Sequence, residues 1–180
     1  MQRNVNLMIK KIFLLILISF LLFLSYLGAS KHIPMQFYSE IIIKQSIDKT
    51  IALWQDKNNY QYWQDGFISK ELISGTKDEK GAVSIIKLKQ GNGEMELKET
   101  VMSSNLHTEY NVLIEHQHMS NTMNNHFIAI DENTTLWKTE INYFKVNFWP
   151  AKIMMRLFPN MFKKQGEKWW NQFKDFAEKQ

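Results

Sequence analysis

The sequence contains no cysteine and has only three prolines and seven glycines among its 180 residues. Without cysteine the chain forms no disulfide bond, performs no thiol chemistry and carries no lipid-modified cysteine. A continuous basic stripe is also missing, because the net charge of +4 comes from lysines scattered among glutamates. This charge distribution is typical of a solvated surface, so we expect no nucleic-acid partner.

One long run, Ile12–Ala29, has no charged residue and is flanked by lysines on both sides. As a helix it would reach about 27 Å at about 1.5 Å per residue, close to the hydrocarbon thickness of a bilayer. We therefore expect a transmembrane helix over residues 12–29, after a basic segment over residues 1–11. The alternative is a cleaved signal peptide, because Gly28-Ala29-Ser30 supplies small residues near a possible cleavage site.

Positive charge is unequal on the two sides of this run. Arg3, Lys10 and Lys11 precede it, whereas Lys31 follows it. The positive-inside rule then predicts a single-pass protein with its N-terminus in the cytoplasm and its domain on the extracytoplasmic side. Cleavage of a signal peptide would instead give a secreted or periplasmic domain.

The remainder of the chain is long enough for one domain with its own core. We expect a tether at residues 30–36 and the domain at residues 37–180. Hydrophobic alternation and turn residues predict strands at the start and middle of the domain, and apolar residues at helical spacing predict a long helix at its end. The predicted elements are a strand at Phe37–Ile47, short helices at Lys49–Gln55 (capped by Asp48) and Asn58–Gln64, strands at Phe67–Ser74, Ala82–Gln90, Glu94–Met102, His107–His118, Thr122–Asp131 and Thr134–Asn147, and a helix at Ala151–Lys179.

Two residues interrupt the last helix. Pro159 is expected to kink or restart it, because proline lacks the N–H and clashes with the preceding turn. Gly166 lies in the helix interior, where glycine is about 1 kcal/mol less favourable than alanine. We therefore expect Gly166 to admit a close neighbour.

Three sets of residues carry a resemblance to a known superfamily. They are an aliphatic–aromatic pair followed by an Asp and a Tyr-x-x-Trp element, a Met-x-x-x-Glu-x-Val strand, and two parts of the final helix. The residues are Leu53-Trp54, Asp56 and Tyr60-x-x-Trp63; Met95–Val101; and Leu157–Met161 with Phe173–Glu178. In these features the chain resembles the START/Bet v 1-like superfamily, also called SRPBCC or polyketide cyclase/dehydrase-like proteins. The chain departs from the family pattern at Asp48-Lys49, where members often carry Ala-Pro.

The resemblance covers nearly all of Phe37–Glu178 and implies an α+β helix-grip fold. In this fold an antiparallel sheet of about six to seven strands, with two short helices after the first strand, wraps around the long C-terminal helix. It also implies a cavity between sheet and helix, where apolar and aromatic side chains form either core or ligand-binding wall. The expected lining is Trp63, Met95, Leu97, Glu99, Tyr110, Trp137, Tyr143, Met154, Phe158, Phe162 and Trp169.

Glu99 is the carboxylate that strand alternation places inside. It shares parity with Met95, Leu97 and Val101, whereas the glutamates before it fall on the other face. A desolvated carboxylate suits a general acid or base, which makes Glu99 a catalytic candidate. The alternative is that the strand bulges, or that Glu99 pairs with a lysine or a tyrosine hydroxyl.

Three histidines form a candidate metal site. His116 and His118 face the same side of one predicted strand, and a turn at Ser120-Asn121 would bring His126 close to His116. Three imidazoles with a glutamate or water suit zinc. The alternative is that these polar residues meet solvent at a hairpin tip.

Taken together, these features predict a membrane-anchored domain that binds a hydrophobic or amphipathic small molecule, such as a lipid, an isoprenoid or a polyketide-like compound. The sequence shows no activated nucleophile and no cofactor fingerprint, so binding is favoured over catalysis and no cofactor is expected. One alternative is a cyclase- or dehydratase-type enzyme that uses Glu99. Another is a protein-interaction module with a filled core and a protein partner.

Overall fold

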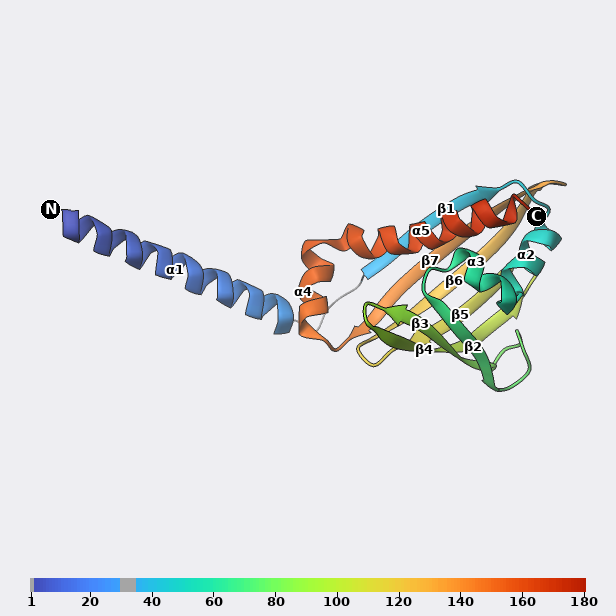
Figure 1. The fold of residues 1–180 in the computed structure, drawn as a ribbon, viewed down its shortest axis with the longest axis horizontal. Coiled ribbons are helices and arrows are strands. Elements are labelled where there is room, and N and C mark those ends of the chain that lie inside the picture. Colours follow the sequence, from blue (N-terminus) through green and yellow to red (C-terminus); the bar gives the residue numbers. More distant parts are fainter. Residues whose placement is uncertain (1, 30–34) are drawn as a thin grey trace.

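The computed structural model describes residues 2–29 and 35–180, with side chains from residue 5 onward (Figure 1). Residues 30–34 of the expected tether lie outside the described residues. The first strand begins at Met35, so the last two residues of the expected tether, 35 and 36, belong to the strand. The elements are α1 (Gln2–Ala29), β1 (Met35–Ile43), α2 (Ile47–Gln55), the 3-10 turn η1 (Lys57–Asn59), α3 (Tyr60–Trp63), β2 (Phe67–Ser74), β3 (Val83–Gln90), β4 (Gly93–Asn105), β5 (Glu109–Glu115), β6 (Met119–Asp131), β7 (Thr134–Val146), α4 (Trp149–Leu157) and α5 (Pro159–Ala177).

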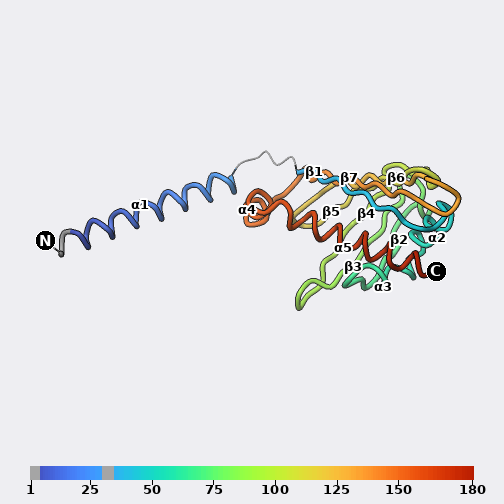
Figure 2. The backbone as a smooth tube through the Cα atoms, turned by 90° about the horizontal axis from the view of Figure 1, so that it is seen from above, coloured from blue at the N-terminus to red at the C-terminus, as the bar shows by residue number. Residues whose placement is uncertain are grey.

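The seven strands form one antiparallel sheet in the order β1-β7-β6-β5-β4-β3-β2. Its strands curve around α5, as the two perpendicular views in Figures 1 and 2 show. Alternation holds along β7, where Thr135, Trp137, Thr139 and Ile141 are buried. This arrangement is the helix-grip architecture expected from the sequence.

The two ends of the sheet have different neighbours. At one end, Met35 pairs with Tyr143 and Met119 pairs with Val146, and this end adjoins α4 and, through it, α1. We call it the proximal end. The opposite end, where Ile43 pairs with Thr135, is covered by α2, and we call it the distal end.

The start of α2 corrects one prediction. The first strand ends at Ile43 rather than continuing to Ile47, and Ser46 rather than Asp48 caps the helix. Ser46 Oγ accepts a hydrogen bond from the backbone N–H of Lys49 at 3.4 Å. Asp48 lies in the first turn, where a negative charge is favourable near the positive end of the helix dipole.

Pro159 divides the predicted C-terminal helix into two. It occupies the first turn of α5, where a missing N–H leaves no hydrogen bond unmade, and Phe158 between the helices has a non-helical φ of −134°. The helix α4 therefore turns away from the line of α5 and packs against the last turn of α1 (Figure 1).

Gly166 lies in α5 directly below the indole of Trp170. A Cβ at this position would lie 2.9 Å from Trp170 Cη2, which is closer than carbon atoms pack. Trp170 is buried in the core and its ring contacts Trp137, with 6.4 Å between centroids. The expected close neighbour of Gly166 is thus the side chain one turn further along the same helix.

Replacing Gly166 by Ala is expected to lower the free energy of unfolding by about 1 kcal/mol. The gain in helix propensity of about 1 kcal/mol is outweighed by an overpacking cost of about 1–3 kcal/mol. Chemical denaturation of the full chain in detergent measures the change, with the exposed neighbour Gln165→Ala as a control expected to stay within about 0.5 kcal/mol. A stabilised Gly166→Ala variant would contradict this prediction, because it would mean that the Trp170 indole moves away from the added methyl group at little cost.

The distal part of the grip, the space between the sheet and α5, is filled by aromatic side chains. Phe173 of α5 is fully buried and its ring lies 5.5 Å from that of Trp137. The Trp137 ring also contacts Phe127 at 5.7 Å and Trp54 at 6.0 Å. These rings interdigitate in edge-to-face and stacked pairs, as a close-packed core does.

Candidate functional site

Two oppositely charged side chains face each other inside the grip. Lys70 of β2 places Nζ 2.9 Å from Glu99 Oε1 of β4, and the two side chains are only 14% and 10% exposed. Glu99 therefore faces inward, and it is paired with a lysine, the alternative that the sequence left open. Buried charges are tolerated when they are paired in this way.

Two phenol groups accompany the ion pair. Lys70 Nζ donates a hydrogen bond to Tyr60 Oη at 3.4 Å and lies 5.2 Å from the centre of the Tyr60 ring. Burial raises the pKa of Tyr60, and the Glu99 carboxylate adds to this while Lys70 opposes it. Burial raises the pKa of Tyr110 as well, again with a contribution from Glu99. Both phenols are therefore neutral near pH 7.

The ammonium group of Lys70 stays charged despite its burial. Burial alone would lower the pKa of Lys70, but the attraction of neighbouring negative groups outweighs it and the net pKa lies above the usual lysine value. Because Tyr60 is protonated at neutral pH, Glu99 is the partner that maintains this charge. The cluster thus combines a cation, a carboxylate and two phenols, which together can bind a polar group by donating and accepting hydrogen bonds.

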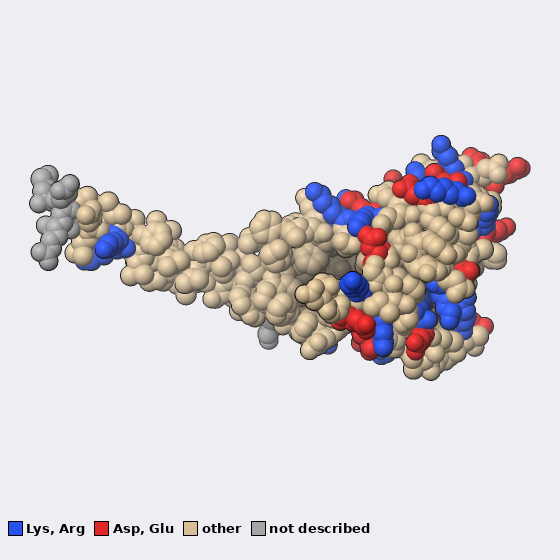
Figure 3. All heavy atoms as spheres, in the orientation of Figure 1, with Lys and Arg blue, Asp and Glu red and all other residues tan. Residues whose placement is uncertain are grey.

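The cluster lies at the boundary between the filled and the open part of the grip. Along the inward face of β4, Val101 on the distal side of Glu99 is buried in the aromatic core, whereas Leu97 and Met95 on the proximal side are only partly buried. Figure 3 shows a recess on one face of the molecule, next to the uncharged end of the domain that adjoins α1. A ligand bound in the open part would therefore meet the polar cluster at its inner end.

The structure separates the predicted cavity residues into three groups. Some are built into the cores, some are half-buried, and two near α4 are exposed. The core group consists of Trp63, Tyr110 and Trp137, with Tyr143 and Phe162 against a smaller proximal core. The half-buried group is Met95, Leu97 and Trp169, whereas Glu99 is buried. Met154 and Phe158 are 37% and 51% exposed.

Two of these residues carry indole N–H groups without an acceptor among the described residues. Nε1 of Trp63 and Nε1 of Trp169 are both buried and make no hydrogen bond within that part of the chain. A buried, unpaired donor is unfavourable by about 1–3 kcal/mol. Each indole therefore offers a donor to a water molecule or to an acceptor on a bound molecule.

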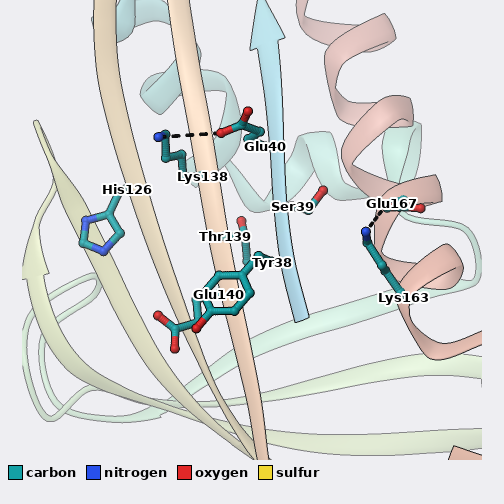
Figure 4. A pocket seen from close by; sticks show the side chains of 9 residues that line it. All are labelled: Tyr38, Ser39, Glu40, His126, Lys138, Thr139, Glu140, Lys163 and Glu167. Carbon is teal, nitrogen blue, oxygen red and sulfur yellow. Dashed lines mark ion pairs between the residues drawn. The ribbon is translucent and has the colours of Figure 1, made fainter. Parts of the chain in front are cut away.

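A pocket of about 560 Å³ lies elsewhere, on the strands β1, β6 and β7 beside α5 (Figure 4). Its charged groups are largely paired: Lys138 with Glu40 at 3.6 Å, and Lys163 with Glu167 at 3.4 Å. None of the predicted cavity residues lines it. It is therefore a polar surface hollow rather than the predicted interior cavity, and its lining residues are Tyr38, Ser39, Glu40, His126, Lys138, Thr139, Glu140, Lys163 and Glu167.

The three candidate metal ligands do not come together. His126 lies in the pocket of Figure 4, opposite Glu109 in the sheet, whereas the rings of His116 and His118 are neighbours at 5.5 Å. The described residues contain no group of three potential ligands placed to hold a metal ion. The zinc hypothesis for His116, His118 and His126 is therefore wrong.

The position of a hairpin turn explains this error. The turn between β5 and β6 is formed by His116, Gln117 and His118 and closes with a hydrogen bond from the His116 N–H to the Met119 carbonyl at 2.8 Å. Ser120 belongs to β6, so His126 lies further along its strand than a turn at Ser120-Asn121 would place it. The backbone N–H of His118 donates to His116 Nδ1 at 3.3 Å, and burial together with His118 lowers the pKa of His116.

The signals for two site residues were present in the sequence but ambiguous. Lys70 is one of many lysines. It lies three residues after the apolar Phe67, so strict strand alternation predicts that it lies on the opposite, outward face. Asn125 shares parity with Met123 and Phe127, which places an amide in the core. In the structure Asn125 is fully buried and hydrogen-bonded to three partners behind the polar cluster.

Comparison with known proteins gives no match to a protein-family model and none to a curated protein. Solved structures do match. Ara h 8.0201 is 10% identical with a TM-score of 0.65, over 82% of this chain and 99% of its own. The Zhui aromatase/cyclase from Streptomyces sp. R1128 is 8% identical with a TM-score of 0.64, over 81% and 94%. A START superfamily protein from Mycobacterium smegmatis is 9% identical with a TM-score of 0.54, over 74% and 96%. The chain therefore has the Bet v 1/START-like helix-grip fold that its sequence motifs predicted.

Proposed function

We propose that this protein is a membrane-anchored domain that binds a hydrophobic or amphipathic small molecule in the proximal part of its grip. The apolar anchor is residues 12–29 and the binding domain is residues 37–180. The observation that carries the proposal is the boundary at Glu99. On one side Met95 and Leu97 are partly uncovered beside their buried β3 partners Leu88 and Ile86, and on the other side the aromatic core is closed. A lipid-like molecule would place its chain against Met95 and Leu97 and its polar end at Lys70 and Glu99.

The anchor is supported by the composition and exposure of α1. Its segment Val5–Ala29 is long and apolar enough to cross a bilayer and is almost entirely uncovered by the rest of the chain. An apolar helix with no protein to pack against is stable in lipid rather than in water. A signal sequence has the same composition, and the depth measurement at Leu17 below tests whether α1 lies in the bilayer. The proposal of an N-terminus in the cytoplasm and a domain outside it is supported by Arg3, Lys10 and Lys11, which precede the apolar run.

Photo-crosslinking in the full chain tests the binding site. Purified protein in lipid nanodiscs is incubated with a fatty acid that carries a photoreactive diazirine, and the adducts are located by mass spectrometry. We expect adducts in the proximal part of β4 and in the first half of α5, and competition by excess unlabelled fatty acid. Adducts confined to α1, or none within the domain, would contradict the proposal.

Matched tryptophan substitutions provide the control. Leu97→Trp fills the proximal grip and removes on the order of 60 Å² of apolar contact, about 1.5 kcal/mol, so adduct formation should fall about tenfold. Met102→Trp adds the same ring on the exposed outer face of β4 and should leave adduct formation unchanged. Equal yields from both variants would place the ligand elsewhere.

A protein-interaction role is the second candidate, because the distal core is filled and large apolar side chains are exposed around α4. In that case the photoreactive fatty acid would label only the anchor, while the exposed apolar side chains would be covered by protein. The enzymatic alternative has less support, since Glu99 Oε1 already binds Lys70 Nζ at 2.9 Å. A general base must be within reach of a substrate proton, which this pairing opposes.

A further inference from the structure

The segment around α4 exposes several large apolar side chains in a small part of the surface. Trp149 is 60% exposed and Met161 56% exposed, and Phe148, Leu157 and Phe158 are exposed as well. We call these five residues the α4 apolar face. Contiguous exposed apolar residues of this size mark a surface that meets another apolar phase.

The position of α4 relative to α1 shows which phase this is. A Cβ on Gly28 would lie 3.5 Å from Trp149 Cε3 and 3.9 Å from Ile153 Cδ1, so α4 packs directly on the last turn of α1. The Arg156 guanidinium donates a hydrogen bond to the carbonyl of Leu27. The helix α4 is therefore fixed next to residues 27 and 28.

The length of the anchor sets the depth of this contact. The uncharged run ends at Ala29, and all of it, about 27 Å at about 1.5 Å per residue, is needed to cross a hydrocarbon layer of about 30 Å. Leu27 and Gly28 then lie at the outer boundary of the hydrocarbon. Any element that touches them lies at that boundary too.

The charges near α4 fit the same location. Residues 147–165 include Lys152, Arg156, Lys163 and Lys164 and no acidic residue. Basic residues beside an apolar face suit the head-group region, where lipid phosphates are negative, and tryptophan is enriched at the same depth. The view in Figure 3 shows that the domain is largely uncharged where it adjoins α1, whereas Asp and Glu gather further away.

We propose that α4 is an interfacial helix whose apolar face inserts into the bilayer leaflet from which α1 emerges. This inference rests on the proposed membrane anchor and goes beyond it, because it fixes the orientation of the domain. The proximal end of the grip then faces the membrane. A lipid-like ligand passes between the bilayer and the grip along an apolar path, past the α4 apolar face, without crossing water.

Depth measurements with single labels test this inference in the full chain. The protein has no cysteine, so one introduced cysteine accepts one nitroxide label. We would compare Leu157→Cys and Met161→Cys, on the α4 apolar face, with Ile73→Cys, an exposed apolar position one residue before the end of β2. That end of β2 lies on the side of the domain away from α1 (Figure 1). Leu17→Cys, in the middle of α1, reports on the anchor. Collisions of each label with oxygen, which concentrates in the acyl region, and with a water-soluble nickel complex give its depth.

We expect the oxygen-to-nickel collision ratio at Leu157→Cys and Met161→Cys to be several-fold higher than at Ile73→Cys, and lower than at Leu17→Cys. A high ratio at Leu17→Cys, together with ratios at the two α4 positions as low as at Ile73→Cys, would overturn the inference. The proposed anchor would still stand in that case. A low ratio at Leu17→Cys would remove the anchor and the inference together. Low collision rates with both reagents at the two α4 positions would also overturn it, because the face would then be covered by protein, and dipolar broadening would identify a second copy of the chain.

Discussion

Replacing Lys70 by Met is expected to lower the free energy of unfolding by about 3–5 kcal/mol, because it leaves the carboxylate of Glu99 buried without a counter-charge. Chemical denaturation of the full chain in detergent measures this change. The pKa of Lys70 is raised in the folded protein, so the stability that the Lys70 charge contributes is fully present below the unfolded lysine value of 10.5 and is lost only as the pH rises through the folded pKa. The difference between wild type and variant should therefore be the same at neutral and at mildly alkaline pH.

An exposed ion pair in the same sheet supplies the matched control. Lys98 Nζ lies 3.0 Å from Glu115 Oε2, nearly the distance of the buried pair, but its two side chains are 50% and 42% exposed. Lys98→Met should therefore change the free energy of unfolding by no more than about 1 kcal/mol. The double variant Lys70→Met/Glu99→Leu removes both buried charges and should recover much of the lost stability. Similar losses for Lys70→Met and Lys98→Met would show that water reaches the buried pair.

Replacing Asn125 by Ala is expected to lower the free energy of unfolding by more than about 3 kcal/mol. The substitution leaves three buried polar groups without their hydrogen-bond partner, at about 1–3 kcal/mol each. Asn125 Oδ1 accepts hydrogen bonds from Trp137 Nε1 at 3.1 Å and from Thr139 Oγ1 at 3.0 Å. Its Nδ2 donates to the carbonyl of Tyr110 at 3.0 Å. The side chain thus ties β5, β6 and β7 together behind the polar cluster.

Asn142→Ala is the control for this substitution. Asn142 is exposed on β7, so the same truncation should change the stability by less than about 0.5 kcal/mol. The total tryptophan fluorescence, to which Trp137 contributes, gives a second readout, because loss of the hydrogen bond between Trp137 and Asn125 alters the surroundings of a buried indole. If the two asparagine variants unfolded at the same denaturant concentration, the network would contribute little.

The sequence predicted the fold well because its elements have regular periods. Alternation along β4 placed Glu99 on the inward face with Met95, Leu97 and Val101, and the structure has it there. The turn residues between strands and the proline at position 159 marked most element ends correctly. These signals are local, so they can be recognised in the sequence without knowing what each element packs against.

The sequence did not predict Lys70 as the partner of Glu99, for a specific structural reason. The strand β2 is irregular, with register shifts between Phe67 and Ser69 and between Leu72 and Ser74. The first of these shifts reverses the face on which the following residues lie, which turns Lys70 inward opposite Ile86. Strict alternation from Phe67 gives the opposite answer.

How far side chains fill the grip was unpredictable for a different reason. Core and cavity wall are made of the same aromatic and aliphatic side chains, and only the packing tells them apart. Trp63, Tyr110 and Trp137 are now in the core, whereas Met95 and Leu97 are partly uncovered. The hairpin at His116–His118 adds an error of register, because Ser120-Asn121 has turn-forming composition but lies in β6.

The contact between Gly28 and Trp149 would give the proposed anchor a mechanical role. A helix held only by a loose tether would leave its domain free to swing, but here the last turn of α1 is joined to the body of the protein through α4. Bilayers that are thinner or thicker than the apolar run change the tilt of a transmembrane helix. With α1 as the proposed anchor, such a tilt would be passed on through α4 as a rotation of the whole domain, and membrane thickness would then set the angle at which the grip meets the lipid.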